Sequence, residues 1–187
     1  MNDIYVLGKL LKKDRRAIAV VGTRMPSGRG KELTIKFVKE LVKDKFTIVS
    51  GLARGIDTIA HETALKCGGR TIAVLGSGLD IIYPPENRLL AEAIVKNGAL
   101  VSGFPYGTKP EGKNFLARNQ LIVKLSHAVL VIEGMKRSGT ISTANHAGNE
   151  GTEVFAIAGS EATDYLIENG ATAVQKAKEI VDYLDNI

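Results

Sequence analysis

Residues 17–24, AIAVVGTR, decide the fold class: five apolar residues run directly into a glycine, a threonine and an arginine. A short, continuous apolar run that ends at a glycine is typical of a strand buried on both faces, because a half-exposed strand would alternate apolar and polar residues. Strands of this kind belong to parallel sheets that helices cover on both sides. The segment therefore predicts a buried strand of an α/β domain, with Gly22, Thr23 and Arg24 just beyond its end.

The rest of the chain repeats this unit of apolar strand, small-residue turn and amphipathic helix. Further strands are predicted over 47–49, 71–75, 99–101, 128–132 and 154–158, and helices over 31–43, 56–66, 87–96, 115–125 and 140–149. A single core domain is expected over 17–187, with a helical tail from residue 164 that Gly170 interrupts, and residues 1–16 as a short helical lead-in. Alternating strands and helices predict a doubly wound, mostly parallel sheet in a Rossmann-like, three-layer α/β domain.

Composition narrows the class of protein. The 187 residues are 44% hydrophobic and 24% charged, as in folded soluble domains. A membrane span needs about 20 apolar residues, and no run approaches that length, nor does the N-terminus have the unbroken apolar region of a secretory signal. We therefore expect a cytoplasmic protein without membrane contact. Cys67 is the single cysteine, which excludes an intramolecular disulfide and a cysteine metal cluster, and it is expected to be buried.

Small and basic residues follow the predicted strands at the edge where open parallel sheets bind ligands. Glycines let the backbone approach a phosphate, helix N-termini offer free N–H groups, and arginine matches phosphate oxygens. The net charge of +5, from 25 basic and 20 acidic residues, also favours a polyanionic partner. A phosphate-binding site is predicted from Gly22, Thr23, Arg24, Ser50, Gly51, Arg54, Gly55, Ser138, Gly139 and Thr140, with Lys109, Lys113 and Arg118 as an electrostatic track in and after a loop over 102–114.

Other residues receive weaker or open assignments. Phe115 either stacks on a base or anchors the loop to the core. Asp57 is expected to cap a helix start, and His61, four residues later, to make a structural hydrogen bond, since one His and one Asp are too few for a metal site. No catalytic residue, metal site or cofactor is predicted. The segment after Gly22 lacks the dinucleotide fingerprint, and no Gly-Lys-Ser/Thr sequence is present, so NAD and P-loop ATP binding are disfavoured.

The motifs that follow the strands resemble those of the DNA-processing protein A family (DprA, also called Smf). The resemblance covers roughly residues 15–175, in order, and is highly specific. It is carried by Val21-Gly22-Thr23-Arg24, Ser50-Gly51-Leu52-Ala53-Arg54-Gly55-Ile56-Asp57, Ala73-Val74-Leu75-Gly76, Tyr83-Pro84, Phe115-x-x-Arg118-Asn119, Ser138-Gly139-Thr140 and Val154-Phe155-Ala156-Ile157.

The resemblance implies an extended Rossmann-like fold and a homodimer. It further implies single-stranded DNA binding, protection of incoming strands in natural transformation, and loading of a RecA-type recombinase. By motif, the implied DNA contacts are Arg24, Ser50, Arg54, Lys113, Phe115, Arg118 and Asn119, with backbone donors at Gly139-Thr140. The sequence departs from the family at Ser102-Gly103, where Ser-Glu is usual, and at Gln120, where the second arginine of the usual Arg-Asn-Arg is lost. The family's helical and winged-helix domains do not fit into residues 1–16 or 176–187.

Two alternatives stay open at this point. Phosphoribohydrolases of the same fold superfamily place a catalytic Glu where this chain has Thr143, which cannot supply a carboxylate to an oxocarbenium-like transition state. Glu133 and Glu150 are the nearby acids that could substitute for it. The second alternative is a module that binds a small nucleotide and signals to a partner.

Overall fold

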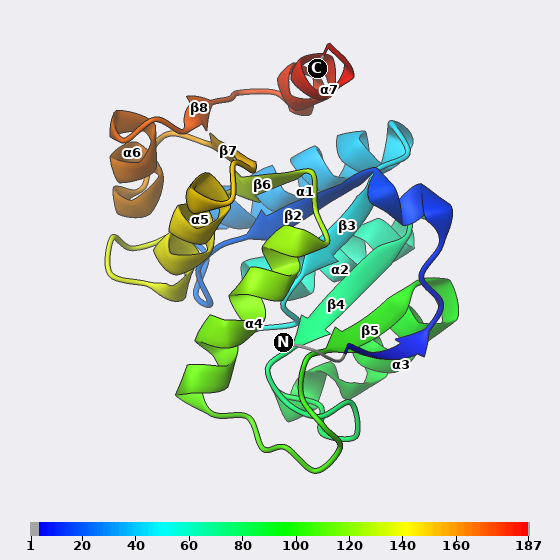
Figure 1. Cartoon of the computed structure of the whole chain (residues 1–187). Coiled ribbons are helices and arrows are strands. Elements are labelled where there is room, and N and C mark those ends of the chain that lie inside the picture. The colour runs from blue at the N-terminus through cyan, green and yellow to red at the C-terminus, as the bar shows by residue number, and fades with distance from the viewer. Residues whose placement is uncertain (1–3, 187) are drawn as a thin grey trace.

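The computed structural model describes residues 4–186 and contains an eight-stranded sheet in the order β1-β5-β4-β3-β2-β6-β7-β8 (Figure 1). The strands are β1 (Tyr5–Gly8), β2 (Ala17–Val21), β3 (Thr47–Ser50), β4 (Thr71–Leu75), β5 (Ala99–Ser102), β6 (Ala128–Val131), β7 (Glu153–Ala156) and β8 (Thr172–Ala173). The helices are α1 (Gly28–Lys43), α2 (Ile56–Lys66), α3 (Arg88–Asn97), α4 (Gly112–Lys124), α5 (Gly139–Asn149), α6 (Glu161–Glu168) and α7 (Ala177–Asp185), with 3-10 turns at Lys12–Arg15 and Pro85–Asn87.

The sheet is doubly wound, as the sequence predicts. From β2 the chain winds outward through β3, β4 and β5, then returns to the other side of β2 and continues through β6, β7 and β8. All of these strands pair in parallel, and only β1, on the outer edge of β5, is antiparallel among the described strands. The winding direction reverses between β2 and β6, and in such sheets a crevice opens beyond the carboxyl ends of those two strands.

The side chains of β2 alternate between two cores, which explains why the whole strand is apolar. Ile18 and Val20 pack with α1, α2 and α7, whereas Ala17, Ala19 and Val21 pack with α4, α5 and α6 on the opposite face. A third apolar cluster lies under α3, against β4 and β5. Helices therefore cover both faces, which confirms the predicted three-layer arrangement (Figure 1).

The prediction of a helical lead-in is wrong for the residues that form β1. Tyr5–Gly8 pairs with β5, and the following residues make only one 3-10 turn at Lys12–Arg15. The side chains of Val6 and Leu7 are 41% and 42% exposed and therefore contribute little packing. This strand is held mainly by hydrogen bonds to the free backbone groups on the edge of β5. Hydrogen bonds to a distant strand leave no periodicity in the sequence, and the pattern of residues 1–16 therefore did not indicate a strand.

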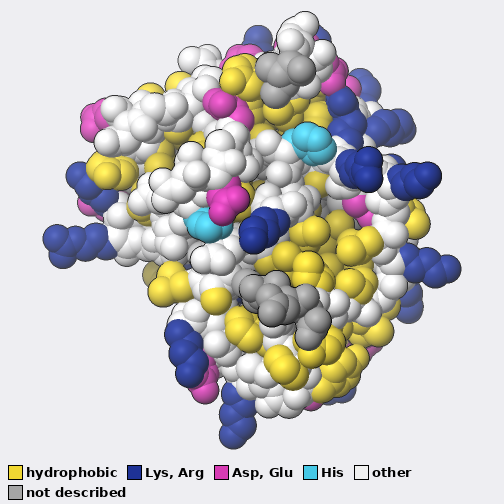
Figure 2. Space-filling model, in the orientation of Figure 1, with side chains coloured by type: hydrophobic (Ala, Val, Ile, Leu, Met, Phe, Trp, Pro, Cys, Tyr) yellow, Lys and Arg dark blue, Asp and Glu magenta, His cyan; other side chains and the backbone are white. Residues whose placement is uncertain are grey.

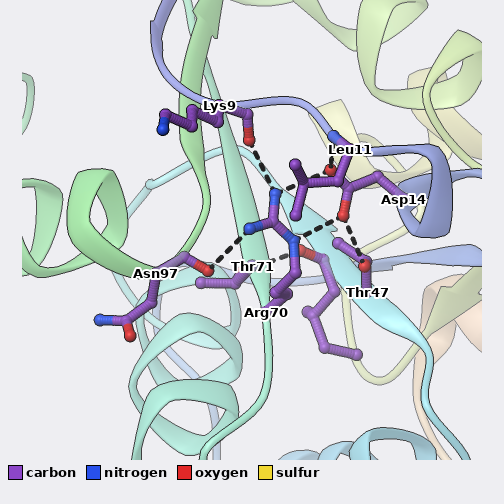
Figure 3. A network of polar contacts seen from close by, with 8 residues as sticks. Lys9, Leu11, Asp14, Thr47, Arg70, Thr71 and Asn97 are labelled. Atoms are coloured by element: carbon purple, nitrogen blue, oxygen red, sulfur yellow. Dashed lines mark hydrogen bonds and ion pairs between the residues drawn. The ribbon is translucent and has the colours of Figure 1, made fainter.

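An ion-pair network attaches the N-terminal segment to the sheet (Figure 3). Arg70 donates to both carboxylate oxygens of Asp14 at 2.7 Å and to the carbonyl of Lys9 at 2.7 Å. Asp14 also accepts from the hydroxyl of Thr47 at 3.0 Å and from the amide of Leu11 at 2.7 Å. Burial raises the pKa of the Asp14 carboxyl, but the bonds from Arg70, Leu11 and Thr47 together hold that pKa below its ordinary value.

Cys67 is exposed, contrary to the prediction, because it follows the last residue of α2 at the point where Gly68 turns the chain. On the face that carries α4 and α5, the Lys and Arg side chains stand mainly around the outline (Figure 2). Among residues 4–186, no helix combines the length and the apolar character that crossing a bilayer would require.

Candidate nucleic-acid interface

A cleft of about 670 Å³ lies at the switch point, beyond the carboxyl ends of β2 and β6. The first turns of α4 and α5 form its walls. Most of the predicted site residues line it: Gly22, Thr23, Arg24, Phe115, Arg118, Asn119, Ser138, Gly139 and Thr140. Arg54 and Gly55 line an adjoining hollow of about 610 Å³ that Arg24 also lines. The predicted convergence of strand ends is therefore present.

Glycines bring the loops of the cleft close together. A Cβ on Gly22 would lie 2.6 Å from the side chain of Ile56 and 2.8 Å from the carbonyl of Glu133. Gly55 has a φ of 77°, which favours glycine. The close approach allows the Thr23 amide to donate to Glu133 at 2.8 Å, and the Ile56 amide to donate to Thr23 at 3.1 Å. These bonds fix the loop that presents Arg24 to the cleft.

Arg118 is buried in the floor of the cleft, with 5% of its surface exposed. Its guanidinium donates to the carbonyls of Gly51 and Val74, the latter at 2.6 Å, and to the side-chain oxygen of Asn119 at 3.2 Å. Burial lowers the pKa of Arg118, and the nearby carboxylate of Asp57 opposes that shift. Arg118 thus places a fixed positive charge beneath the cleft, whereas the sequence predicted it as part of an electrostatic track in and after the loop over 102–114.

Two further polar residues beneath the cleft, Asp57 and Ser50, have structural contacts. The Asp57 carboxylate accepts from the amides of Gly51 at 3.1 Å and Ala53 at 3.3 Å, so it caps the turn before α2. Burial raises the pKa of Asp57, while Arg118 acts in the opposite direction. The Ser50 hydroxyl is buried and donates to the Val20 carbonyl at 2.7 Å. Ser50, predicted as a site residue, is placed in the core beneath the loop.

His61 makes the structural hydrogen bond that the sequence predicted, and its partner is Thr71. The Nδ1 atom of His61 lies 2.6 Å from the Thr71 hydroxyl, which itself donates to the Ile48 carbonyl at 2.8 Å. Because that hydroxyl proton is committed, Nδ1 of His61 must carry the proton. Burial, followed by the charge of Arg118, lowers the pKa of His61 to about 3, so the ring is neutral in the folded protein.

Aromatic and cationic side chains form a row that begins with Arg24 and Phe115 in the cleft and continues to Tyr83 and Arg54 beside it. The Phe115 and Tyr83 rings lie 5.6 Å apart between centroids. The Arg24 guanidinium lies 5.6 Å from the Phe115 centroid, and that of Arg54 lies 6.0 Å from the Tyr83 centroid. Phe115 also packs against Gly76, so it anchors α4 and still lines the cleft. Tyr83 was not among the predicted site residues, although its Tyr-Pro pair belonged to the family motif.

The N-terminus of α5 supplies backbone donors to the cleft. Its N-cap, Ser138, makes no side-chain capping bond and instead donates to the Met135 carbonyl at 2.7 Å. Asn119 and Thr143 both donate to the Gly139 carbonyl, at 3.3 and 3.0 Å, which fixes the first turn. An uncapped helix start directs free N–H groups and a partial positive charge outward, and anions bind at such positions. Arg137, which the sequence analysis did not select, also lines the cleft there.

The two predicted lysines lie outside the lining of the cleft. Lys109 is exposed on the loop before α4, and Lys113 is exposed in the first turn of that helix, 3.0 Å from the carboxylate of Glu111. Their predicted contact with a nucleic-acid backbone stays a prediction. Arg54 is also ion-paired, 2.5 Å from Glu86, with both side chains about half exposed, at 50% and 51%.

The acids considered for a hydrolase are placed elsewhere. Glu133 accepts from the amide and hydroxyl of Ser27, at 3.0 and 2.7 Å, and so holds the start of α1. Glu150 follows the last residue of α5, at the end of the helix opposite to the cleft. Neither carboxylate lines the cleft. The geometry therefore gives no support to either acid as a replacement for the catalytic Glu.

A doubly wound sheet with glycine turns, arginines and an uncapped helix start at its switch point defines a Rossmann-like domain, and such features are typical of anion-binding sites. A sequence profile of the DNA recombination-mediator protein A family matches residues 2–185. The chain belongs to this family, which confirms the resemblance found in the sequence.

Relatives and solved structures agree with this membership. The chain is 43% identical to the Smf protein of Synechocystis over 98% of its own length and 49% of the relative, and 41% identical to the DNA processing protein DprA of Bacillus subtilis over 94% and 61%. It therefore spans about half to three-fifths of the length of these relatives.

Two solved structures of the family have nearly the same fold. DNA processing protein A from Streptococcus pneumoniae superposes with a TM-score of 0.91 at 37% identity, covering 96% of this chain and 65% of that one. DNA processing protein A from Helicobacter pylori, described for its single-stranded DNA binding mode, gives a TM-score of 0.89 at 32% identity, covering 100% and 90%. Molybdenum cofactor carrier proteins share the fold at 16–18% identity.

Proposed function

We propose that this chain binds single-stranded DNA in the switch-point cleft and acts in DNA processing without a catalytic step of its own. One observation carries the proposal: the cleft is lined together by the free amides of the α5 N-terminus, two exposed arginines, Arg24 and Arg137, and the ring of Phe115. Amides and arginines suit phosphates, and an aromatic face suits an unstacked base, which only a single strand offers. The single-stranded DNA binding described for the Helicobacter pylori relative supports the same assignment.

Each part of the cleft has a distinct role in this proposal. The amides of Gly139 and Thr140 and the guanidinium of Arg24 hold successive phosphates, and Phe115 stacks on the intervening base. Arg118 contributes its charge from below without a direct contact. Arg54, Lys109 and Lys113 attract the flanking backbone from outside the cleft, where exposed charges act over roughly 8–10 Å in physiological salt.

The wider biological role extends the same proposal. The bound strand is protected and then handed to a RecA-type recombinase during natural transformation or related recombination. The protein acts as a homodimer in the cytoplasm. The DNA-processing names of the relatives support this role in outline.

Fluorescence anisotropy with labelled oligo(dT) at two salt concentrations tests the proposal, with duplex DNA as the comparison. We expect selective binding of the single strand, with log affinity falling against log salt by about 0.7 for each phosphate contact. The Arg24→Ala variant is expected to bind about fivefold more weakly and to have a smaller salt slope, because it lacks one charged contact.

Arg88→Ala is the matched control, since Arg88 is an exposed arginine on α3, outside the lining of the cleft. It should bind like the unaltered protein. Absence of single-strand binding at micromolar protein and low salt would refute the proposal. Displacement of the DNA by a nucleoside monophosphate at equal phosphate concentration would instead indicate a small-nucleotide module.

A further inference from the structure

A second hollow continues from the cleft along the groove between α4 and α5. Its volume is about 580 Å³, and it shares Leu116, Asn119, Arg137 and Ser138 with the cleft. The two helices lie side by side on the same face of the sheet (Figure 1). A flexible chain held at the α5 N-terminus can therefore enter this groove without leaving the protein surface.

Side-chain amides dominate the polar lining of this groove. Asn145 and Asn149 are four residues apart on α5, one turn beyond Ser142, and Gln120 faces them from α4. Within residues 4–186, none of these four side chains makes a hydrogen bond to another residue. Their donors and acceptors are thus available to a ligand.

His146 adds a buried polar atom to the same wall. Its Nε2 atom is inaccessible to solvent and has no hydrogen-bond partner in the described part of the chain, and the nearest carboxylate oxygen, of Glu150, is 3.7 Å away. Buried polar atoms are rarely left unpartnered in folded proteins. The Nε2 atom of the structural residue His61 is a second case in the described residues, so this feature supports the groove only together with its amide lining. The His146 ring lines the groove, so it lies beside a ligand bound there, while the Nε2 atom itself is covered.

The charge of the groove differs from that of the cleft. Lys136 lies 4.4 Å from the ring centroid of Tyr165, and its amide donates to Glu161, so its ammonium group is engaged on the α6 side. Arg137 stands at the opening that the groove shares with the cleft. Phosphates accept hydrogen bonds only, whereas base edges both donate and accept, as amides do. The amide lining therefore suits bases better than phosphates.

We infer that the α4–α5 groove is a second part of the binding site, which takes the bases of the nucleotides that follow those held in the cleft. This inference rests on the proposed function and names how the same site is extended. Asn145, Asn149 and Gln120 bond the free base edges of a single strand, with Ser142 and His146 beside them. Duplex DNA cannot offer these edges, because Watson–Crick pairing occupies them. The groove therefore adds selectivity for single strands and little salt dependence.

A length series of oligonucleotides tests the inference, with 6-, 9-, 12- and 18-residue oligo(dT) measured by anisotropy. The affinity of the unaltered protein should rise with oligonucleotide length. Two 12-mers, each abasic in a different half, should differ: the one that lacks bases in the half bound by the groove should lose the gain in affinity, and the other should keep it. The double variant Asn145→Ala/Asn149→Ala should bind the long strands about tenfold more weakly, the effect of two lost hydrogen bonds, with the 6-mer affinity and the salt slope unchanged.

The controls separate the groove from the cleft. Alanine favours helix more than asparagine does, and both positions are exposed, so the double variant should fold normally, as circular dichroism would verify. Gln175→Ala removes an exposed amide before α7 and should bind like the unaltered protein. If the 6-mer binds but length, abasic halves and the double variant have no effect, the groove inference is wrong and the cleft stands. If no oligonucleotide binds, the proposed function itself fails.

Discussion

Two arginines, Arg70 and Arg118, are tied into opposite edges of the same sheet and have very different partners. Arg70 stands at the amino-terminal start of β4, where both oxygens of Asp14 lie 2.7 Å from its guanidinium (Figure 3). Arg118 lies at the carboxyl edge, and its hydrogen bonds within residues 4–186 go to uncharged oxygens, those of Gly51, Val74 and Asn119. Its nearest opposite charge, Asp57, is committed to backbone amides.

Arg70 stabilises the fold, whereas Arg118 also contributes positive charge to the candidate binding site. A guanidinium in a bidentate pair with a carboxylate is neutralised locally, and its field outside the pair is small. A guanidinium held by carbonyls keeps its net charge, which a low-dielectric surrounding screens poorly. Arg70 is thus paired directly with a carboxylate, whereas Arg118 places its charge at the cleft edge of the sheet with Asp57 as a counter-charge that does not bond it.

The largest expected effect comes from removing Arg118. The Arg118→Ala variant leaves Asp57 buried without its counter-charge, and we expect a loss of about 4 kcal/mol in the free energy of unfolding, measured by urea denaturation. Arg88→Ala should leave that free energy unchanged. A fully stable Arg118→Ala protein with weakened DNA binding would show that Arg118 is a free contact residue and would remove the contrast with Arg70.

The stability in acid depends on His61, which is buried and which also senses the positive charge of Arg118. The pKa of His61 is about 3 when folded, through burial and then Arg118, and about 6.5 when unfolded. The unfolded chain therefore binds a proton first, so this contribution is intact above pH 6.5 and is lost by about 1.4 kcal/mol per pH unit as the pH falls toward 4. The His61→Asn variant should lack that slope in urea titrations repeated across this range, and an unchanged slope would contradict the assignment.

Breaking the Asp14–Arg70 ion pair should lower the free energy of unfolding by less than the loss of Arg118 does. The Asp14→Asn variant keeps the shape of the side chain but removes the charge, and a loss of about 2 kcal/mol in the free energy of unfolding is expected. Because the folded pKa of Asp14 lies below its unfolded value, its contribution is present above about pH 4 and disappears below that pH. Single-strand affinity should not change at pH 7. A loss of DNA binding in a folded Asp14→Asn protein would show that both edges of the sheet serve the site.

The smallest effect concerns Glu86, whose carboxylate lies 2.5 Å from Arg54. The Glu86→Gln variant leaves Arg54 without its counter-charge beside the cleft, so it should raise the affinity for oligo(dT) by about twofold and steepen the salt dependence. Thermal denaturation should show no change in stability, since both groups are exposed. Equal or weaker binding by Glu86→Gln would exclude Arg54 from the path of the strand.

The accuracy of the sequence predictions follows the range of the interactions involved. The helix Ile56–Lys66 and the strand Thr71–Leu75 were predicted with their observed bounds, because apolar spacing and glycine ends are local signals. The strand Tyr5–Gly8 was missed, because its pairing with β5 depends on residues more than 90 positions away. The start of α4 was placed at Phe115 instead of Gly112, within the segment predicted as a loop.

The candidate site also divides into residues with a local sequence signal and residues whose placement depends on long-range contacts. Gly22, Arg24 and Gly139 were identified from their places after strands, and all three line the cleft. The burial of Arg118 had no local signal, because its partners Gly51 and Val74 lie 67 and 44 residues away. The role of Tyr83 beside Phe115 was missed for the same reason, since only the folded chain brings the two rings together.

The sequence by itself determined the doubly wound sheet, the sheet edge at which small and basic residues gather, and the family, because these depend on the order of apolar runs, glycines and short motifs. Only the tertiary structure decided which charges face that ligand. Whether an arginine is neutralised, buried or free depends on partners that are distant in sequence and on the local dielectric, and neither is encoded in the spacing of neighbouring residues.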